Sequence, residues 1–170
     1  MTTKLCDGRW DEISSWEFYL SDEMPPRDVC VAASCVGILN GKIVLSRTHR
    51  GWDCLGGHIE DGESVEETMQ REALEEGGLR VERFRLLGFR KVTNSKVIIA
   101  KQTGKPYPLI SFMPWFVAVS SLPLVPTTGD EGEIFESRAF DVEEACTLSK
   151  EEQPIIKAAV AFYEKYMREP

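Results

Sequence analysis

The chain has 170 residues, and its 28 Asp and Glu against 20 Lys and Arg give a formal net charge of −8. This length suits one ordinary domain with a sizeable core, and a hydrophobic fraction of 42% is typical of globular proteins. The charge argues against long nucleic acid as a partner, because phosphate neutralisation needs clustered basic residues. A small nucleotide whose charge is bridged by a metal ion remains compatible with it.

The cysteine pattern gives poor support for a zinc site. The five cysteines are an odd number without C-x-x-C spacing, and the chain has two histidines. Reduced thiols are the simplest account, so we expect a cytoplasmic protein. No run approaches the roughly 20 apolar residues of a membrane span, and we expect no membrane partner.

The first part of the chain predicts an extension followed by a hairpin. Residues 1–28 are polar and aromatic, and we interpret them as an N-terminal extension of a single domain over residues 1–170. Residues 28–39 and 43–48 predict strands, and Asn40-Gly41 between them is a strong hairpin signal. The aromatic residues of the extension are expected either to cover the core or to form a homodimer interface; they are Trp10, Trp16, Phe18 and Tyr19.

A glycine-rich loop over residues 51–62 leads into a predicted helix over residues 65–76. Ser64 and Glu67 have the spacing of a capping box, which satisfies free amide groups at a helix start. No Gly or Pro interrupts the helix, and Gly77-Gly78 supplies its C-terminal stop.

One face of this helix concentrates carboxylates. Glu72, Glu75 and Glu76 fall within roughly a 100° arc of the helix. Three carboxylates this close repel one another unless a cation lies between them, and such oxygen ligands suit Mg²⁺. Arg71 and Glu75 form an i, i+4 pair that can orient the carboxylate.

The remaining elements alternate between strands and loops and end in a helix. Strands are predicted over 79–92, 109–119 and 133–140, loops over 93–108 and 121–132, and an amphipathic helix over about 150–168. Pro154 fits the first turn of this last helix. Strands mixed with a few helices predict an α/β fold, a sheet sandwiched between helices.

The segment from Gly57 to Leu79 resembles the Nudix box, the pattern G-x5-E-x7-R-E-U-x-E-E-x-G-U with U an apolar residue. All nine specified positions are filled, by Gly57, Glu63, Arg71, Glu72, Ala73, Glu75, Glu76, Gly78 and Leu79. The resemblance implies the Nudix fold, an α/β/α sandwich with a mixed sheet and the box as a loop–helix–loop. It also implies hydrolysis of a nucleoside diphosphate linked to another group, with Mg²⁺ or Mn²⁺.

By motif position, the resemblance implies a role for each box residue. Glu72, Glu75 and Glu76 would bind the metal ion together with the Gly57 carbonyl, Arg71 would orient the glutamates, and Glu63 would brace the site. The resemblance implies that the general base would be one of the three metal-binding glutamates, or an acid from a later loop. The candidates in that loop are Asp130, Glu131 and Glu133, for which a solvated acidic loop is an equal interpretation.

Upstream of the box, the run Trp52-Asp-Cys-Leu-Gly-Gly57 has leucine where the family often has proline. This change removes no ligand, so we expect activity to survive. Arg47 matches a position that often meets phosphate in the family. Arg50 is a second candidate for substrate binding, against ordinary surface charge. Trp52 is expected either to stack on a base or to cover the core.

The leading hypothesis is therefore a pyrophosphohydrolase of a small nucleotide, whose identity the sequence does not reveal. The alternative is a non-catalytic Nudix-fold sensor or regulator that holds a nucleotide. Such proteins usually lose box glutamates, and this chain has lost none.

Overall fold

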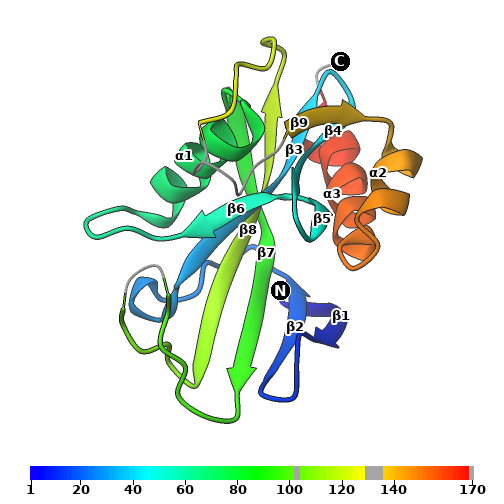
Figure 1. Ribbon diagram of the computed structural model, residues 1–170. Helices are drawn as coiled ribbons and strands as arrows, with labels where there is room; N and C mark the ends of the chain where they lie inside the picture. Colours follow the sequence, from blue (N-terminus) through cyan, green and yellow to red (C-terminus); the bar gives the residue numbers. More distant parts are fainter. Residues whose placement is uncertain (102–103, 129–135, 169–170) are drawn as a thin grey trace.

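The computed structural model describes residues 1–101, 104–128 and 136–168. In this part of the chain a nine-stranded sheet has the order β1-β2-β7-β8-β3-β4-β5, with β6 paired to β3 and β9 paired to β4 (Figure 1). The strands are β1 (Thr3–Arg9), β2 (Ser14–Leu20), β3 (Ala32–Leu39), β4 (Lys42–Thr48), β5 (Gly51–Asp53), β6 (Leu55–His58), β7 (Arg83–Asn94), β8 (Ile110–Ser120) and β9 (Glu136–Phe140). The helices are the 3₁₀ turn η1 (Arg27–Val29), α1 (Val65–Gly77), α2 (Val142–Leu148) and α3 (Gln153–Tyr166).

Helices cover both faces of the sheet, α1 on one face and α2 and α3 on the other (Figure 1). The β3 and β8 strands are parallel and the other named pairs are antiparallel, so the sheet is mixed. Successive residues of a strand point to opposite faces. In β3, Val36 and Ile38 accordingly join the core beneath α3, while Ala33 and Cys35 join the core beneath α1. The predicted α/β/α sandwich is confirmed.

The predicted hairpin is confirmed between β3 and β4. Leu39 pairs with Lys42, and the two residues between them have positive φ angles of 49° at Asn40 and 81° at Gly41. An Asn-Gly turn of this kind matches the right-handed twist of the strands that it joins.

Two predicted boundaries were wrong around the box. Residues 51–62 were expected to form a loop, but β5 pairs with β4 and β6 pairs with β3 inside this range. The strand predicted from residue 79 begins instead at Arg83. Leu79 belongs to the cap that follows α1, because its amide donates to the Ala73 carbonyl at 2.9 Å while Gly78 takes the left-handed conformation.

The N-terminal segment forms two strands that sequence analysis did not assign. The β1–β2 hairpin adds to the sheet through antiparallel pairing of β2 with β7. Trp16 and Phe18 are buried in the core beneath α3, which is the first of the two alternatives for these aromatic residues. A homodimer interface remains a prediction.

The C-terminal helix α3 confirms its prediction with shorter bounds, and Pro154 lies in its first turn. Ile155, Ile156 and Ala159 are fully buried against the sheet. The short helix α2 was not predicted, because seven residues give too little periodicity to recognise. Within the described residues, no helix is both long and apolar enough to cross a membrane.

Candidate active site

The box folds as a loop followed by α1, and the predicted capping box closes the start of the helix. The Ser64 amide donates to Glu67 Oε2 at 2.8 Å, and the Glu67 amide donates to Ser64 Oγ at 3.1 Å. Val65, Met69 and Ala73 are buried against the sheet, which fixes the rotation of the helix. The carboxylates of Glu72 and Glu76 therefore lie along the border of the buried face.

Arg71 joins three of the box carboxylates. Its Nε donates to Glu63 Oε1 at 2.6 Å, and its Nη1 donates to Glu72 Oε1 at 2.7 Å and to Glu75 Oε2 at 3.0 Å. Nη2 also donates to the His58 carbonyl oxygen at 3.0 Å, which ties α1 to β6. The predicted pair of Arg71 and Glu75 is confirmed, and Arg71 holds Glu72 and Glu63 as well.

Two glycines let β6 lie against its neighbours. A Cβ atom at Gly57 would overlap the Glu72 carboxylate, and one at Gly56 would overlap Ser34. The Gly56 amide donates to Glu76 Oε2 at 3.0 Å. The absence of side chains at these positions allows the backbone of β6 to meet both carboxylates.

Glu63, Glu72 and Glu76 differ in their electrostatic environment. Hydrogen bonds from Arg71 lower the pKa of Glu63 to about 2. Burial raises the pKa of Glu76 to about 7, against the opposing effect of the Gly56 amide, and burial also raises the pKa of Glu72. In the described part of the chain no Lys or Arg forms an ion pair with Glu76. Glu76 is thus a partly buried acid without an ion pair, and the charge of Arg50 only partly offsets the effect of burial on its pKa.

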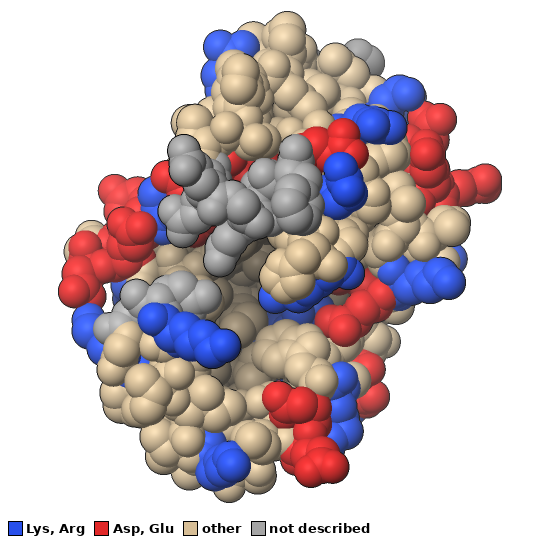
Figure 2. Space-filling model, viewed as in Figure 1, with Lys and Arg blue, Asp and Glu red and all other residues tan. Residues whose placement is uncertain are grey.

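A cavity of about 540 Å³ adjoins this group, and Gly56 and Gly57 form part of its wall. Aromatic and charged side chains line the rest, among them Trp10, Trp115, Arg50, Arg90, Asp53 and Glu152. Burial and the nearby Glu152 raise the pKa of Asp53 to about 6. Figure 2 shows acidic side chains gathered over the loop before α1, and a hollow near the centre of the same face with basic and acidic groups beside it.

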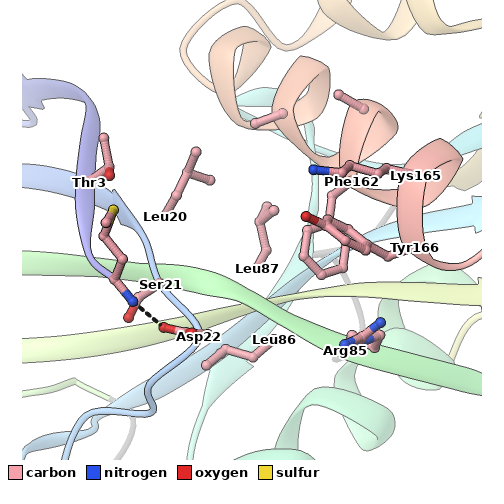
Figure 3. A pocket seen from close by; sticks show the side chains of 13 residues that line it. Thr3, Leu20, Ser21, Asp22, Arg85, Leu86, Leu87, Phe162, Lys165 and Tyr166 are labelled. Atoms are coloured by element: carbon pink, nitrogen blue, oxygen red, sulfur yellow. Dashed lines mark hydrogen bonds and ion pairs between the residues drawn. The ribbon is translucent and has the colours of Figure 1, made fainter.

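A larger cavity of about 840 Å³ lies elsewhere, between the N-terminal strands and α3. Figure 3 shows Leu20, Leu87 and Phe162 facing into it. Its one acid, Asp22, pairs with the N-terminal amine at 2.7 Å, and no box residue lines it. Of these two cavities, only the smaller has box residues in its wall, Gly57 and His58.

The predicted substrate residues occupy different positions. Arg50 and Trp52 line the smaller cavity. The Trp52 ring also packs against Phe140 with centroids 4.8 Å apart, so it covers the core, and its stacking on a base stays a prediction. The Arg47 Nε donates to Glu136 Oε1 at 3.0 Å, and its contact with phosphate stays a prediction. The loop acids Asp130, Glu131 and Glu133 lie outside the described residues.

Sequence reasoning missed the residues at the other end of this cavity. Arg90 comes from β7 and Trp115 from β8, while Trp10 lies in the turn between β1 and β2. These positions come together only through the pairing of β2 with β7 and of β7 with β8. A lone Arg in a strand and scattered tryptophans give no local signal of that pairing.

The donor groups fit a hard divalent cation in their chemistry. Glu72 and Glu76 are partly buried carboxylates whose pKa values are raised by burial, and a cation beside them would offset the cost of their charge. As the side chains stand, no three Asp, Glu, His or Cys residues of the described chain are arranged to hold an ion. Arg71 instead bridges Glu72 and Glu75, so ion binding would require these carboxylates to reorient.

Comparison with known proteins agrees with this geometry. The model of the NUDIX domain family matches residues 28–162. A mutant form of the pyrophosphohydrolase BsRppH of Bacillus subtilis matches with a TM-score of 0.68 and 20% identity, over 96% of this chain and 99% of that chain. The NUDIX domain of Shewanella oneidensis NrtR, complexed with ADP ribose, matches with a TM-score of 0.58 and 16% identity, over 81% and 92%.

A third match comes from a eukaryote. The Ap4A hydrolase of C. elegans matches with a TM-score of 0.54 and 16% identity, over 79% of this chain and 99% of that chain. At these identities the matches show a shared fold. The family model leaves out residues 1–27, which contain the β1–β2 hairpin.

Proposed function

Because this chain belongs to the NUDIX family, we propose that it is a metal-dependent pyrophosphohydrolase of a small nucleotide. The bond cleaved is a phosphoanhydride in a nucleoside diphosphate linked to another group. The observation that carries this proposal is the complete set of box carboxylates, with partly buried Glu76, which forms no ion pair in the described chain, near a cavity of about 540 Å³. The fold alone would also suit a protein that only binds nucleotides.

We assign the divalent ion, Mg²⁺ or Mn²⁺, to Glu72, Glu75, Glu76 and the Gly57 carbonyl. When bound, such an ion neutralises phosphate charge and lowers the pKa of water. Arg71 keeps Glu72 and Glu75 close to each other through its hydrogen bonds, and Glu63 in turn holds Arg71. Glu76 is one candidate for the general base, together with Glu72 and Glu75.

Proteins with a similar fold support the reaction class. One is a pyrophosphohydrolase and another is an Ap4A hydrolase. The NrtR domain was solved with ADP ribose, so nucleotide binding on this fold also occurs in that protein. We further propose a cytoplasmic location, since all five cysteines are free.

A phosphate-release screen with Mg²⁺ and with Mn²⁺ tests the proposal. The panel covers canonical and oxidised nucleoside triphosphates, ADP-ribose, NADH, nucleotide sugars and dinucleoside polyphosphates. A nucleotidase or phosphatase is added where the direct products carry no free phosphate. We expect hydrolysis of one class by the native chain and its loss in Glu76→Gln. No hydrolysis across the panel, together with tight nucleotide binding, would favour a sensor.

A further inference from the structure

The unsatisfied buried donors of this protein gather in one place. Within the described residues, the buried side-chain nitrogen and oxygen atoms without a hydrogen-bond partner are Arg90 Nε and Nη2, Trp16 Nε1 and Trp115 Nε1. All of them are donors, and they belong to neighbouring strands of one sheet. Buried donors normally have partners, so this cluster lacks an acceptor.

Arg90 is held by aromatic rings. Its guanidinium carbon lies 4.4 Å from the ring centre of Trp16, 5.3 Å from that of Trp115 and 5.4 Å from that of Trp10. The residue is only 6% exposed, yet it forms part of the cavity wall. Cation–π contacts keep the charge in place without using its N–H groups, which leaves those groups for a ligand.

Glu151 covers Arg90 in this structure. Its Oε1 accepts from Trp10 Nε1 at 3.2 Å and lies 3.7 Å from Arg90 Nη2, too far for a hydrogen bond. The Glu151 side chain is 50% exposed, so it can move away into solvent. The position of the Glu151 carboxylate shows where an anionic group would be attracted to Arg90. At this distance the carboxylate leaves the Arg90 donors without a hydrogen bond.

We propose that Arg90 is the anchor of an anion subsite in the cavity, which binds a phosphate or carboxylate group after displacing Glu151. The Nε and Nη2 atoms lie on one edge of the guanidinium and can donate two parallel hydrogen bonds to such a group. Trp10 and Trp16 come from the β1–β2 hairpin, outside the matched family region. This hairpin therefore contributes to ligand selection.

Applied to the substrate, this inference rests on the proposed function. The same cavity reaches Gly56 and Gly57 beside the box carboxylates. A substrate whose phosphoanhydride lies near the box carboxylates would place another anionic group at Arg90. That group would belong to the part of the substrate remote from the cleaved bond. Nucleotides with a charged group on that part would be favoured over those without one.

The test is a titration of the full-length protein with inorganic phosphate, and separately with acetate, followed by tryptophan fluorescence in EDTA. Chelation removes binding through metal ions, and three tryptophans surround Arg90 to report its occupancy. We expect saturable binding, about two- to fivefold tighter in Glu151→Gln because an exposed competing ion pair is removed. Arg90→Met should weaken binding about tenfold or more. The anion that binds more tightly shows whether the subsite prefers a phosphate or a carboxylate group.

Arg85→Met is the matched control. Arg85 lies on the same strand and also near two aromatic rings, 5.7 Å from Phe162 and from Tyr166, but at the larger cavity (Figure 3). Its replacement should leave anion binding unchanged. If a thermal melt shows that Arg90→Met does not fold, the comparison of anion binding by Glu151→Gln and by the native chain still tests the subsite.

Two results would overturn the subsite: no saturation by either anion in the native chain and in Glu151→Gln, or unchanged binding in folded Arg90→Met. Hydrolysis that depends on Glu76, found together with a flat titration, would reject the subsite and keep the proposed function. Anion binding at Arg90 without hydrolysis of any nucleotide would keep the subsite and reject the proposed function. With both in place, Arg90→Met should raise KM for a substrate with a charged end group and leave kcat within about threefold.

Discussion

Glu76 differs from the other box carboxylates in what neutralises it. Arg71 donates to Glu63, Glu72 and Glu75, whereas Glu76 receives one hydrogen bond, from the Gly56 amide. An ionised carboxylate in this environment is costly, and the cost falls when a cation binds beside it. Glu76 is therefore the side chain whose loss should affect ion binding most directly.

At this scale we predict that Glu76→Gln lowers kcat by about 100-fold or more, since it removes a charge from a water-poor site. It should also weaken Mn²⁺ binding measured by calorimetry, with little change in the melting temperature. The control is Glu66→Gln, which removes the same charge from the same helix away from Gly56 and Gly57. Equal kcat values for Glu76→Gln and the native chain would show that the ion assignment is wrong.

At the scale of elements, Glu63 joins the loop before α1 to the helix itself. Its carboxylate accepts from Arg71 and from Thr68 Oγ1, the latter at 2.7 Å, and its carbonyl accepts from Arg27 Nη2 at 2.9 Å. The loop is thereby fixed on α1 and on the turn before β3. These contacts give Glu63 a structural role, which explains why the box has a glutamate at a position that is expected to contact no substrate.

Glu63→Gln should lower the melting temperature at pH 7 by about 2–6 °C, because it replaces charge-assisted hydrogen bonds. The folded pKa of Glu63 is about 2, below its ordinary 4.5, so its charge stabilises the fold above about pH 4.5. That contribution is lost as the pH falls towards 2, and the difference in melting temperature should shrink with it. Calorimetry between pH 7 and pH 3 measures this, with exposed Glu60→Gln as control.

Leu55 joins β6 to the end of α1. Its side chain is fully buried and contacts Gly77, where a Cβ atom would overlap it. Leu55→Ala should lower the free energy of unfolding by about 2–5 kcal/mol through the cavity that it leaves. Urea unfolding measures the change, and a loss below about 1 kcal/mol would mean that α1 is held in place by other contacts.

Local patterns predicted the elements that carry local signals. The capping box of α1, the Asn40-Gly41 turn and the amphipathic α3 all depend on residues near one another in sequence. The short strands β5 and β6 were missed, since three or four residues rich in glycine form strands here only through pairing with β4 and β3. Tertiary contacts override propensity in such segments.

The residues of the candidate site also fall into those with a local sequence signal and those without one. The box carboxylates and Arg71 lie within one helix and its preceding loop, so their spacing could be interpreted from the sequence. Arg90 and Trp10 reach the cavity through strands paired across long separations, which no spacing rule reveals. Sequence analysis therefore predicted the carboxylates and the arginine of the box, and missed the aromatic residues and Arg90 at the other end of the cavity.

At the scale of the whole molecule, the N-terminal hairpin is part of the core. Phe18 is fully buried and its ring meets that of Trp115 edge to face, with centroids 5.8 Å apart. We predict that Phe18→Ala lowers the free energy of unfolding by about 3–5 kcal/mol in a urea titration. A near-neutral result would mean that residues 1–28 are an appendage after all. Exposed Phe84→Ala is the matched control.

The pairing of β2 with β7 also sets an order of events during synthesis. Ser14 hydrogen-bonds Asn94, 80 residues further along the chain. The hairpin thus leaves the ribosome well before its partner strand exists, and Trp16 and Phe18 have no strand to cover them in the interval. Contacts this distant in sequence slow folding. These strands can join the sheet only once β7 has been made, and for that time they offer an apolar surface to chaperones or to other nascent chains.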